Sequence, residues 1–183
     1  MTYKNETVGE WLDEWLDVYV KPPVRTQNTY DCYRYVIIMM KKIQPELFQM
    51  QLKDVDEMTI QKLLNQSTER YAKSTLKKMK IVFNSSYEIA IRNHKCKFNP
   101  AEYVSVPEGS EKEIRALTIE EEDAVIRAAK NDFLGQIVIF LLNTGLRACE
   151  LINLKWSDYD PVNQVIYVRK SKSKAGIRKV PLL

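Results

Sequence analysis

The sequence TGLRACELINLKWSDYD, residues 144–160, directly follows an apolar run at residues 137–142. The run is typical of a buried helix, and Gly145 can adopt the left-handed conformation that closes a helix. Apolar residues then return at helical spacing, at Leu146, Leu151, Ile152 and Leu154. Arg147 is therefore predicted to lie at a turn between two core helices, with packing on both sides.

The charge of Arg147 decides what surrounds it. Arginine does not lose its proton in proteins, so a buried Arg147 requires an anionic partner. Glu150 stands three residues later, on the same helical face, and could be that partner. Spacing alone leaves two interpretations open, a structural Arg–Glu pair and an anion-binding site.

Length and composition restrict the class of protein. The 183 residues allow one medium domain or two small ones, and a hydrophobic content of 45% is enough for a core. No apolar run is long enough to span a membrane, and no signal peptide opens the chain, so we expect a cytoplasmic protein without a membrane partner. With one histidine and three cysteines that lack metal-ligand spacing, we expect neither a metal nor a cofactor.

Charge is distributed unevenly along the chain. Residues 61–99 hold 9 Lys/Arg against 2 Asp/Glu, and residues 131–183 hold 8 against 4. Between these basic blocks, residues 100–130 hold 4 against 8. Two basic blocks separated by an acidic one are typical of a chain that contacts a polyanion such as nucleic acid at two places. The alternative, two solvated basic surfaces, is also common.

Hydrophobic periodicity predicts four helices in the first half of the chain, at residues 8–20, 26–43, 56–65 and 74–93. Proline limits the first two, and Asn99-Pro100 follows the last. Together they form a predicted bundle over residues 1–104. Lys73, Lys77 and Lys80 fall on one outer stripe of the fourth helix.

The second half of the chain has a different pattern. Residues 105–116 lack periodicity and are interpreted as a linker to a second domain at residues 117–183. Thr118 and Glu121 form a capping box that starts a helix. The apolar side of this helix is predicted to consist of Ala124, Val125, Ala128 and Ala129.

The end of the chain predicts a β-hairpin. Residues 165–168 and 177–183 are predicted as strands, joined by a polar basic loop at residues 170–176. The loop contains Lys170, Lys172 and Lys174 alternating with serines. Because the chain stops within the second strand, we expect this domain to be truncated.

Taken in order, these motifs resemble the tyrosine recombinase (phage integrase) family. Residues 144–158 resemble the family's first catalytic-arginine box, and Leu117-Thr118-x-x-Glu121 resembles the opening of its catalytic domain. Lys172, followed by the sequence RKVPL at residues 178–182, is similar to its lysine hairpin. The resemblance implies a mainly α fold: a four-helix SAM-like core-binding bundle, then a truncated α+β catalytic domain ending in a β-hairpin.

The resemblance also implies a chemistry, DNA strand exchange without metal or ATP. In this family a tyrosine hydroxyl attacks the scissile phosphate, and two arginines stabilise the charge on its oxygens. Arg147 matches the first arginine, and Glu150 would orient it. Lys172 matches the general acid for the leaving oxygen, with Lys174 as the alternative.

The expected partners are double-stranded DNA at recombination core sites and other recombinase protomers. Side chains expected to contact DNA are Arg25, Thr26, Thr29, Lys73, Lys77, Lys78, Lys80 and Lys174.

The family's second arginine, its histidines and its nucleophilic tyrosine follow the hairpin. We therefore expect this chain to bind DNA without cleaving it by itself. The alternatives are a non-catalytic DNA-binding regulator, a truncated recombinase remnant, and a helical interaction module that uses Trp11 and Trp15.

Overall fold

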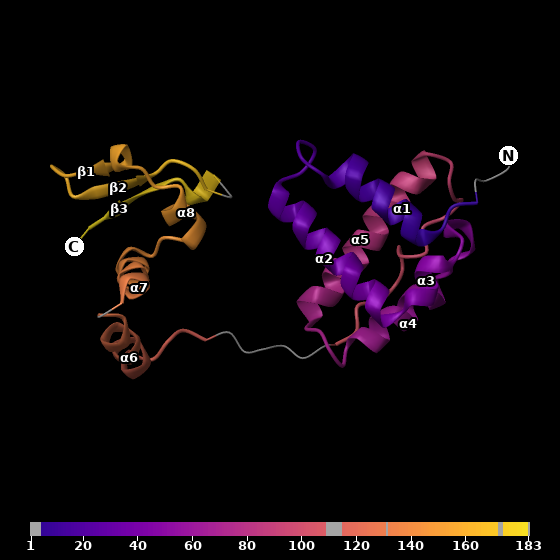
Figure 1. The fold of residues 1–183 in the computed structure, drawn as a ribbon, viewed down its shortest axis with the longest axis horizontal. Helices are drawn as coiled ribbons and strands as arrows, with labels where there is room; N and C mark the ends of the chain where they lie inside the picture. The colour runs from indigo at the N-terminus through magenta and orange to yellow at the C-terminus, as the bar shows by residue number, and fades with distance from the viewer. Residues whose placement is uncertain (1–4, 109–114, 131, 172–173, 183) are drawn as a thin grey trace. The chain divides into compact units, whose positions relative to one another are not determined.

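The computed structural model describes residues 5–108, 115–130, 132–171 and 174–182. The chain divides into two compact units, unit 1 over Met1–Glu113 and unit 2 over Ile114–Leu183, and each is described by itself (Figure 1). Within the described residues, no helix is long and apolar enough to cross a membrane.

Unit 1 is a helical bundle, which confirms the mainly α prediction for this half of the chain. Its elements are α1 (Val8–Trp15), a π-helical turn η1 (Leu16–Val20), α2 (Gln27–Ile43), α3 (Pro45–Gln49), a 3-10 turn η2 (Leu52–Asp54), α4 (Glu57–Ser67) and α5 (Lys73–Arg92). Three helices begin where a side chain accepts a hydrogen bond from the first turn, at Thr7, Thr26 and Asp56. The short α3, which follows Gln44 and opens with a proline, was not predicted.

The core of unit 1 is built from the inward faces of these helices. Trp11, Phe83 and Tyr87 are among its largest fully buried side chains. The two that carry a polar atom find a backbone acceptor: Trp11 Nε1 donates to the Ser86 carbonyl at 3.2 Å, and Tyr87 Oη donates to the Leu52 carbonyl at 3.2 Å. Large aromatic area is thus buried without leaving a donor unsatisfied.

The N-terminal segment is fastened across the bundle. The Leu52 N–H donates to the Glu6 carbonyl, and the Val8 N–H donates to the Met50 carbonyl, both at 2.9 Å. Lys95 Nζ pairs with the Glu6 carboxylate at 2.8 Å and lies 4.6 Å from the centre of the Trp11 ring. We call this set of contacts the N-terminal clasp.

Unit 2 combines three helices with a small antiparallel sheet. Its elements are α6 (Ile119–Ala129), α7 (Phe133–Thr144), α8 (Ala148–Ile152), a 3-10 turn η3 (Trp156–Asp158), β1 (Tyr159–Asp160), β2 (Val165–Val168), a 3-10 turn η4 (Lys174–Gly176) and β3 (Arg178–Pro181). The strand order is β1-β2-β3, and Ile166 pairs with both Tyr159 and Val180. The predicted hairpin and the Thr118–Glu121 capping box are confirmed.

Two expectations about the helices of unit 2 are wrong. The run at residues 137–142 is helical but is not buried, because Val138 and Leu142 are 40% and 38% exposed. On α6, Ala124 and Ala128 are exposed, and only Ala129 is buried among the described residues of that helix. The reason is that the core of unit 2 lies at the sheet, around Leu146, Ile166, Val168 and Val180. Among the described residues of α6 and α7, the apolar side chains that pack against this core are Phe140 and Leu141 of α7.

Candidate functional site

The turn between α7 and α8 sets the position of Arg147. Gly145 closes α7 with φ of +61°, and its N–H donates to the Leu141 carbonyl at 2.9 Å, as the sequence predicted. Leu146 then inserts into the core of unit 2. Arg147 follows in extended conformation as the N-cap residue of α8.

The predicted burial of Arg147 is wrong, and Glu150 is the buried partner instead. The Arg147 side chain is 60% exposed, whereas the Glu150 side chain is 2% exposed. A guanidinium at a helix start can reach water along its flexible stem, while a carboxylate one turn later faces inward. The buried charge is therefore that of the Glu150 carboxylate, which requires hydrogen-bond donors around it.

Glu150 accepts four hydrogen bonds from three residues. Arg147 donates its backbone N–H to Oε2 at 3.0 Å and its Nη1 to Oε1 at 2.9 Å. Ser171 Oγ donates to Oε1 at 2.9 Å, and Arg178 Nη1 donates to Oε1 at 3.2 Å. Arg178 Nη2 also lies 3.1 Å from Oε2. A carboxylate has about four lone-pair sites, so this one is saturated.

These donors fix the protonation state of Glu150. The Arg178 guanidinium, first, and then the Arg147 backbone N–H lower the pKa of the Glu150 carboxyl to about 2, against the opposing effect of burial. Glu150 is therefore ionised at neutral pH. With its lone pairs occupied by these donors, the carboxylate holds the side chains around it in place.

Arg147 keeps donors available for a ligand. Its side chain spends Nη1 on Glu150, and the part of the chain that the structure describes offers no partner to its Nε or Nη2. A guanidinium with free N–H groups in a fixed plane suits two oxygens of a phosphate or carboxylate. The turn therefore presents an exposed, oriented anion-binding group.

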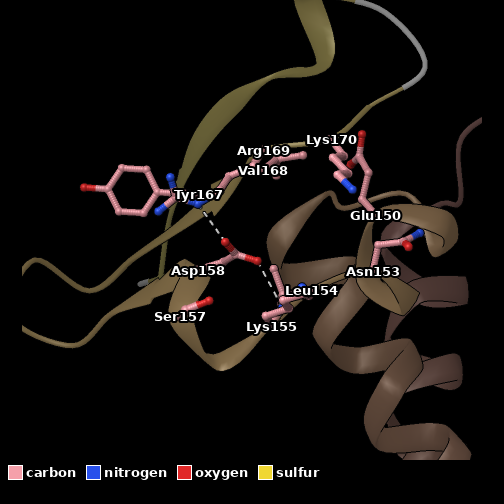
Figure 2. A pocket seen from close by; sticks show the side chains of 10 residues that line it. All are labelled: Glu150, Asn153, Leu154, Lys155, Ser157, Asp158, Tyr167, Val168, Arg169 and Lys170. Carbon is pink, nitrogen blue, oxygen red and sulfur yellow. Dashed lines mark hydrogen bonds and ion pairs between the residues drawn. The ribbon is translucent and has the colours of Figure 1, made fainter.

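Next to Glu150, a polar cavity of about 320 Å³ lies between α8, η3 and β2 (Figure 2). Asp158 projects into this region and accepts hydrogen bonds from the Lys155 N–H at 3.1 Å and from Arg169 Nε at 2.7 Å, both drawn as dashed lines in Figure 2. The Lys155 backbone bond, followed by Arg169, lowers the pKa of Asp158. This ion pair joins η3 to the end of β2.

The side chains of the two lysines predicted in the hairpin loop are not among those that the structure describes. Lys172 lies outside the described residues, and so does the side chain of Lys174, whose backbone belongs to η4. Their predicted role stays a prediction.

Arg178 contacts Glu150 although the sequence motif that contains it predicted no role for it. Its partner Glu150 is 28 residues away in sequence. The only signal for this contact is the hairpin register, in which Arg178 pairs with Val168.

The lysines predicted to contact DNA on α5 differ in their surroundings. Lys73 Nζ pairs with the Glu108 carboxylate at 2.7 Å, and Lys80 Nζ donates to the Val104 carbonyl at 2.5 Å. Both of these ammonium groups thus contact residues that follow α5 in the chain. Lys77 and Lys78 are exposed.

The other predicted contacts lie at the start of α2. Thr26 is the N-cap residue: its Oγ1 accepts from the Thr29 N–H at 3.3 Å and lies 2.9 Å from Thr29 Oγ1. Arg25 is exposed beside them. Thr26 therefore has a structural role whether or not it also contacts a ligand.

Two family models match the chain. The model of the phage integrase family matches residues 111–183, and the model of the phage integrase N-terminal SAM-like domain matches residues 7–67. Together they span most of the sequence, one in each unit.

Two curated proteins are similar over part of their length. An integrase of Streptomyces ambofaciens is 26% identical over 151 residues, which are 82% of this chain and 38% of that protein. Tyrosine recombinase XerA of Saccharolobus solfataricus is 34% identical over 97 residues, which are 53% of this chain and 33% of that protein. The matched region thus covers about two fifths or less of the full length of each relative.

Solved integrase structures share the fold. The Tn1549 transposon integrase in complex with a circular intermediate DNA matches with a TM-score of 0.77 at 20% identity, covering 97% of this chain and 62% of that one. A lambda integrase tetramer bound to a Holliday junction matches with a TM-score of 0.77 at 22% identity, covering 96% of this chain and 50% of that one.

Proposed function

The chain belongs to the phage integrase family of tyrosine recombinases, and from this premise we propose that it binds double-stranded DNA and places Arg147 on a backbone phosphate during site-specific recombination. In this proposal residues 1–104 are the core-binding domain, residues 105–116 the linker, and residues 117–183 part of the catalytic domain.

The observation that carries the proposal is the state of Arg147. Its guanidinium is exposed and oriented by a buried, saturated carboxylate, and no described residue accepts from its Nε or Nη2. Positive charge held in place before the reaction stabilises the negative charge that develops on phosphate oxygens in the transition state. A lysine would provide the charge without the fork that contacts two oxygens.

The remaining roles follow from the family and stay proposals. Lys172 is the proposed general acid for the leaving oxygen, with Lys174 as the alternative. The attacking tyrosine hydroxyl and the second arginine are not assigned to any residue of this chain. Lambda integrase has been solved as a dimer on a core site and as a tetramer on a Holliday junction. By analogy, we propose that this chain meets other protomers on DNA at recombination core sites.

The DNA contact of unit 1 is proposed to involve the exposed Lys77 and Lys78, with Arg25 and Thr29 at the start of α2. Residues 61–99 carry 9 Lys/Arg against 2 Asp/Glu, which favours phosphate contacts. Three further predicted residues already have partners within unit 1: Thr26, Lys73 and Lys80. A DNA contact by any of them would have to form beside that partner or replace it.

A binding experiment at increasing salt tests the proposal. The 183-residue chain is mixed with a random duplex of about three helical turns, and the dissociation constant is measured between about 50 and 200 mM salt. We expect the affinity to fall steeply, because each neutralised phosphate releases a counterion. The double variant Lys77→Gln/Lys78→Gln should reduce the salt slope by about 1 for each lysine.

The matched control is Lys53→Gln, which removes an exposed cation from η2, outside the basic block. It should leave the salt slope unchanged. Absence of duplex binding by the unaltered chain at low salt, or a slope that the Lys77/Lys78 variant shares with the control, contradicts the proposed DNA contact.

A further inference from the structure

Three segments that are distant in sequence meet at the Glu150 carboxylate. Arg147 comes from the turn before α8, Ser171 from the loop after β2, and Arg178 from β3. Ser171 is 21 residues from Glu150 and Arg178 is 28 residues from it. The carboxylate therefore joins the arginine turn to both sides of the β2–β3 hairpin.

Arg178 holds the arginine turn from both sides. Besides its contacts with Glu150, its Nη2 donates to the Gly145 carbonyl at 3.0 Å and its Nη1 to the Gly176 carbonyl at 3.1 Å. Gly145 stands two residues before Arg147, and Glu150 three residues after it. One guanidinium on β3 thus fixes the backbone on one side of Arg147 and the carboxylate on the other.

The Arg147 side chain, in contrast, makes few contacts that would fix its direction. Among the described residues its side chain makes one polar contact, from Nη1 to Glu150 Oε1 at 2.9 Å, and it is mostly exposed. The direction of its guanidinium therefore depends on where the Glu150 carboxylate lies. Without Ser171 and Arg178, only the two hydrogen bonds from Arg147 itself would hold that carboxylate.

Charge balance gives Arg178 a second effect. A carboxylate paired with Arg147 alone would neutralise it and weaken its attraction for an anion. Because Arg178 shares the same carboxylate, the three groups carry one negative and two positive charges. The surplus positive charge is available at the exposed member, Arg147.

The hairpin is shaped so that Ser171 can reach Glu150. Gly176 is buried, and a Cβ atom built on it would lie 1.9 Å from Ser171 Oγ. A side chain there would displace the hydroxyl from its position 2.9 Å from Glu150 Oε1. The absence of a side chain at Gly176 thus permits the third contact with the carboxylate.

We propose that Arg178 and Ser171 are positioning residues, which hold Glu150 so that the Arg147 guanidinium points outward with its free donors available to a DNA phosphate. This inference rests on the proposed function of Arg147. It adds that Glu150 links the conformation of the β2–β3 hairpin to the direction of the Arg147 side chain.

Arginine side-chain NMR signals test the proposal without DNA. The Nε–Hε signal of Arg147 is identified in the ¹⁵N-labelled chain by its loss in Arg147→Ala. We expect Arg178→Met to shift or broaden this signal, because Glu150 loses its main partner. Arg178→Lys should restore the signal only in part, since it returns the charge but not the fork. Ser171→Ala should produce a smaller shift in the same direction.

The matched control is Lys179→Met, which removes a cation from the next position of β3, where Lys179 contacts the Tyr167 ring rather than Glu150. It should leave the Arg147 signal in place. An Arg147 signal that responds equally little to Arg178→Met and to Lys179→Met overturns the proposal. Where the backbone spectrum shows that Arg178→Met does not fold, Arg178→Lys and Ser171→Ala decide: an unchanged Arg147 signal in both overturns it.

Duplex binding separates this inference from the proposed function. If Arg147 contacts a phosphate, Arg178→Met should weaken duplex binding a few-fold, as Arg147→Ala does, and the double variant should be no weaker than Arg147→Ala alone. A shifted Arg147 signal without duplex binding by the unaltered chain contradicts the proposed function but supports the positioning. Duplex binding that needs Arg147, together with an unmoved signal, contradicts the positioning alone.

Discussion

At the scale of the residue, Glu150 is the group on which the candidate site depends. Its ionised form accepts hydrogen bonds from Arg147, Ser171 and Arg178, whereas a protonated carboxyl has fewer free lone pairs and no charge to offset the two guanidinium groups. The lowered pKa of about 2 links this arrangement to the stability of unit 2.

The sign of the resulting pH dependence follows from the direction of the shift. Because the pKa of Glu150 is lower in the folded chain than its ordinary value of 4.5, its stabilising effect is complete above about pH 4.5 and is lost as the pH falls toward about 2. We expect the denaturant midpoint of unit 2 to fall across that window. Glu150→Gln should remove the part of this dependence that Glu150 contributes, while lowering the midpoint at neutral pH.

Glu121 provides the comparison for this measurement. Arg115, first, and then the Thr118 N–H also lower its pKa to about 2, but this pair is exposed and screened by solvent. Glu121→Gln should therefore leave most of the pH dependence in place. A midpoint that responds to pH equally in the unaltered chain and in Glu150→Gln contradicts the central role of Glu150.

Single residues also show where prediction from the sequence stops. The spacing of Arg147 and Glu150 indicated that the two could pair but left an anion site open as the alternative, and the structure shows the pair. Which of the two is buried depends on what else reaches the pair. Arg178 and Ser171 arrive through the hairpin register, and a spacing rule within one helix contains no information about that register.

At the scale of the element, the start of α2 can be tested apart from any DNA contact. Thr26 Oγ1 accepts a hydrogen bond from the first turn, so Thr26→Ala should destabilise unit 1 by about 1 kcal/mol. Thr26→Ser keeps the acceptor and should leave the stability nearly unchanged. Chemical denaturation monitored by circular dichroism measures both. Equal midpoints for the alanine and serine variants would show that the cap contributes nothing.

The contact between α6 and α7 depends on Gly135. A Cβ atom there would lie 2.2 Å from the Ala129 carbonyl oxygen, a backbone atom that cannot rotate away. Gly135→Ala gains about 1 kcal/mol of helix propensity. Separating the two helices costs about 1–3 kcal/mol, as overpacking does elsewhere, so we expect a net loss of stability.

The control for this variant lies on the same helix. Asn143→Ala changes an exposed position of α7 and should not lower the denaturant midpoint of unit 2. A Gly135→Ala variant as stable as Asn143→Ala would contradict the close approach.

The positions of helices and strands were predicted better than the burial of their side chains. The caps at Thr118 and Gly145 are local signals, and the structure confirms both. The apolar run of α7 predicted burial wrongly, because burial depends on which other elements cover a helix and not on its own composition. The two-residue strand β1 is too short to show alternation, so only its pairing with β2 reveals it.

At the scale of the whole molecule, the two units have unequal cores. The hydrophobic cluster of unit 1 draws on all its helices, whereas the buried apolar residues clustered in unit 2 are, among those described, Leu146, Ile166, Val168 and Val180. Stability rises with the apolar area removed from water, so unit 2 should unfold first. We expect urea unfolding to proceed in two steps.

Tryptophan fluorescence can follow the steps separately. Trp11 and Trp15 are buried in unit 1, whereas Trp156 of unit 2 is exposed. In a Trp156→Phe variant the emission therefore reports on unit 1, and the loss of circular dichroism at lower urea reports on unit 2. A single transition seen at the same midpoint by both probes contradicts the separation.

The N-terminal clasp has a practical consequence for anyone who alters the chain. Glu6 pairs with Lys95 and also accepts from the Leu52 N–H, so the residues just before α1 belong to the folded bundle rather than to a dispensable leader. A purification tag or fusion partner should join ahead of Glu6. A version shortened to begin at α1 would leave the Lys95 ammonium with one carboxylate fewer beside Trp11 and the Leu52 N–H without its acceptor.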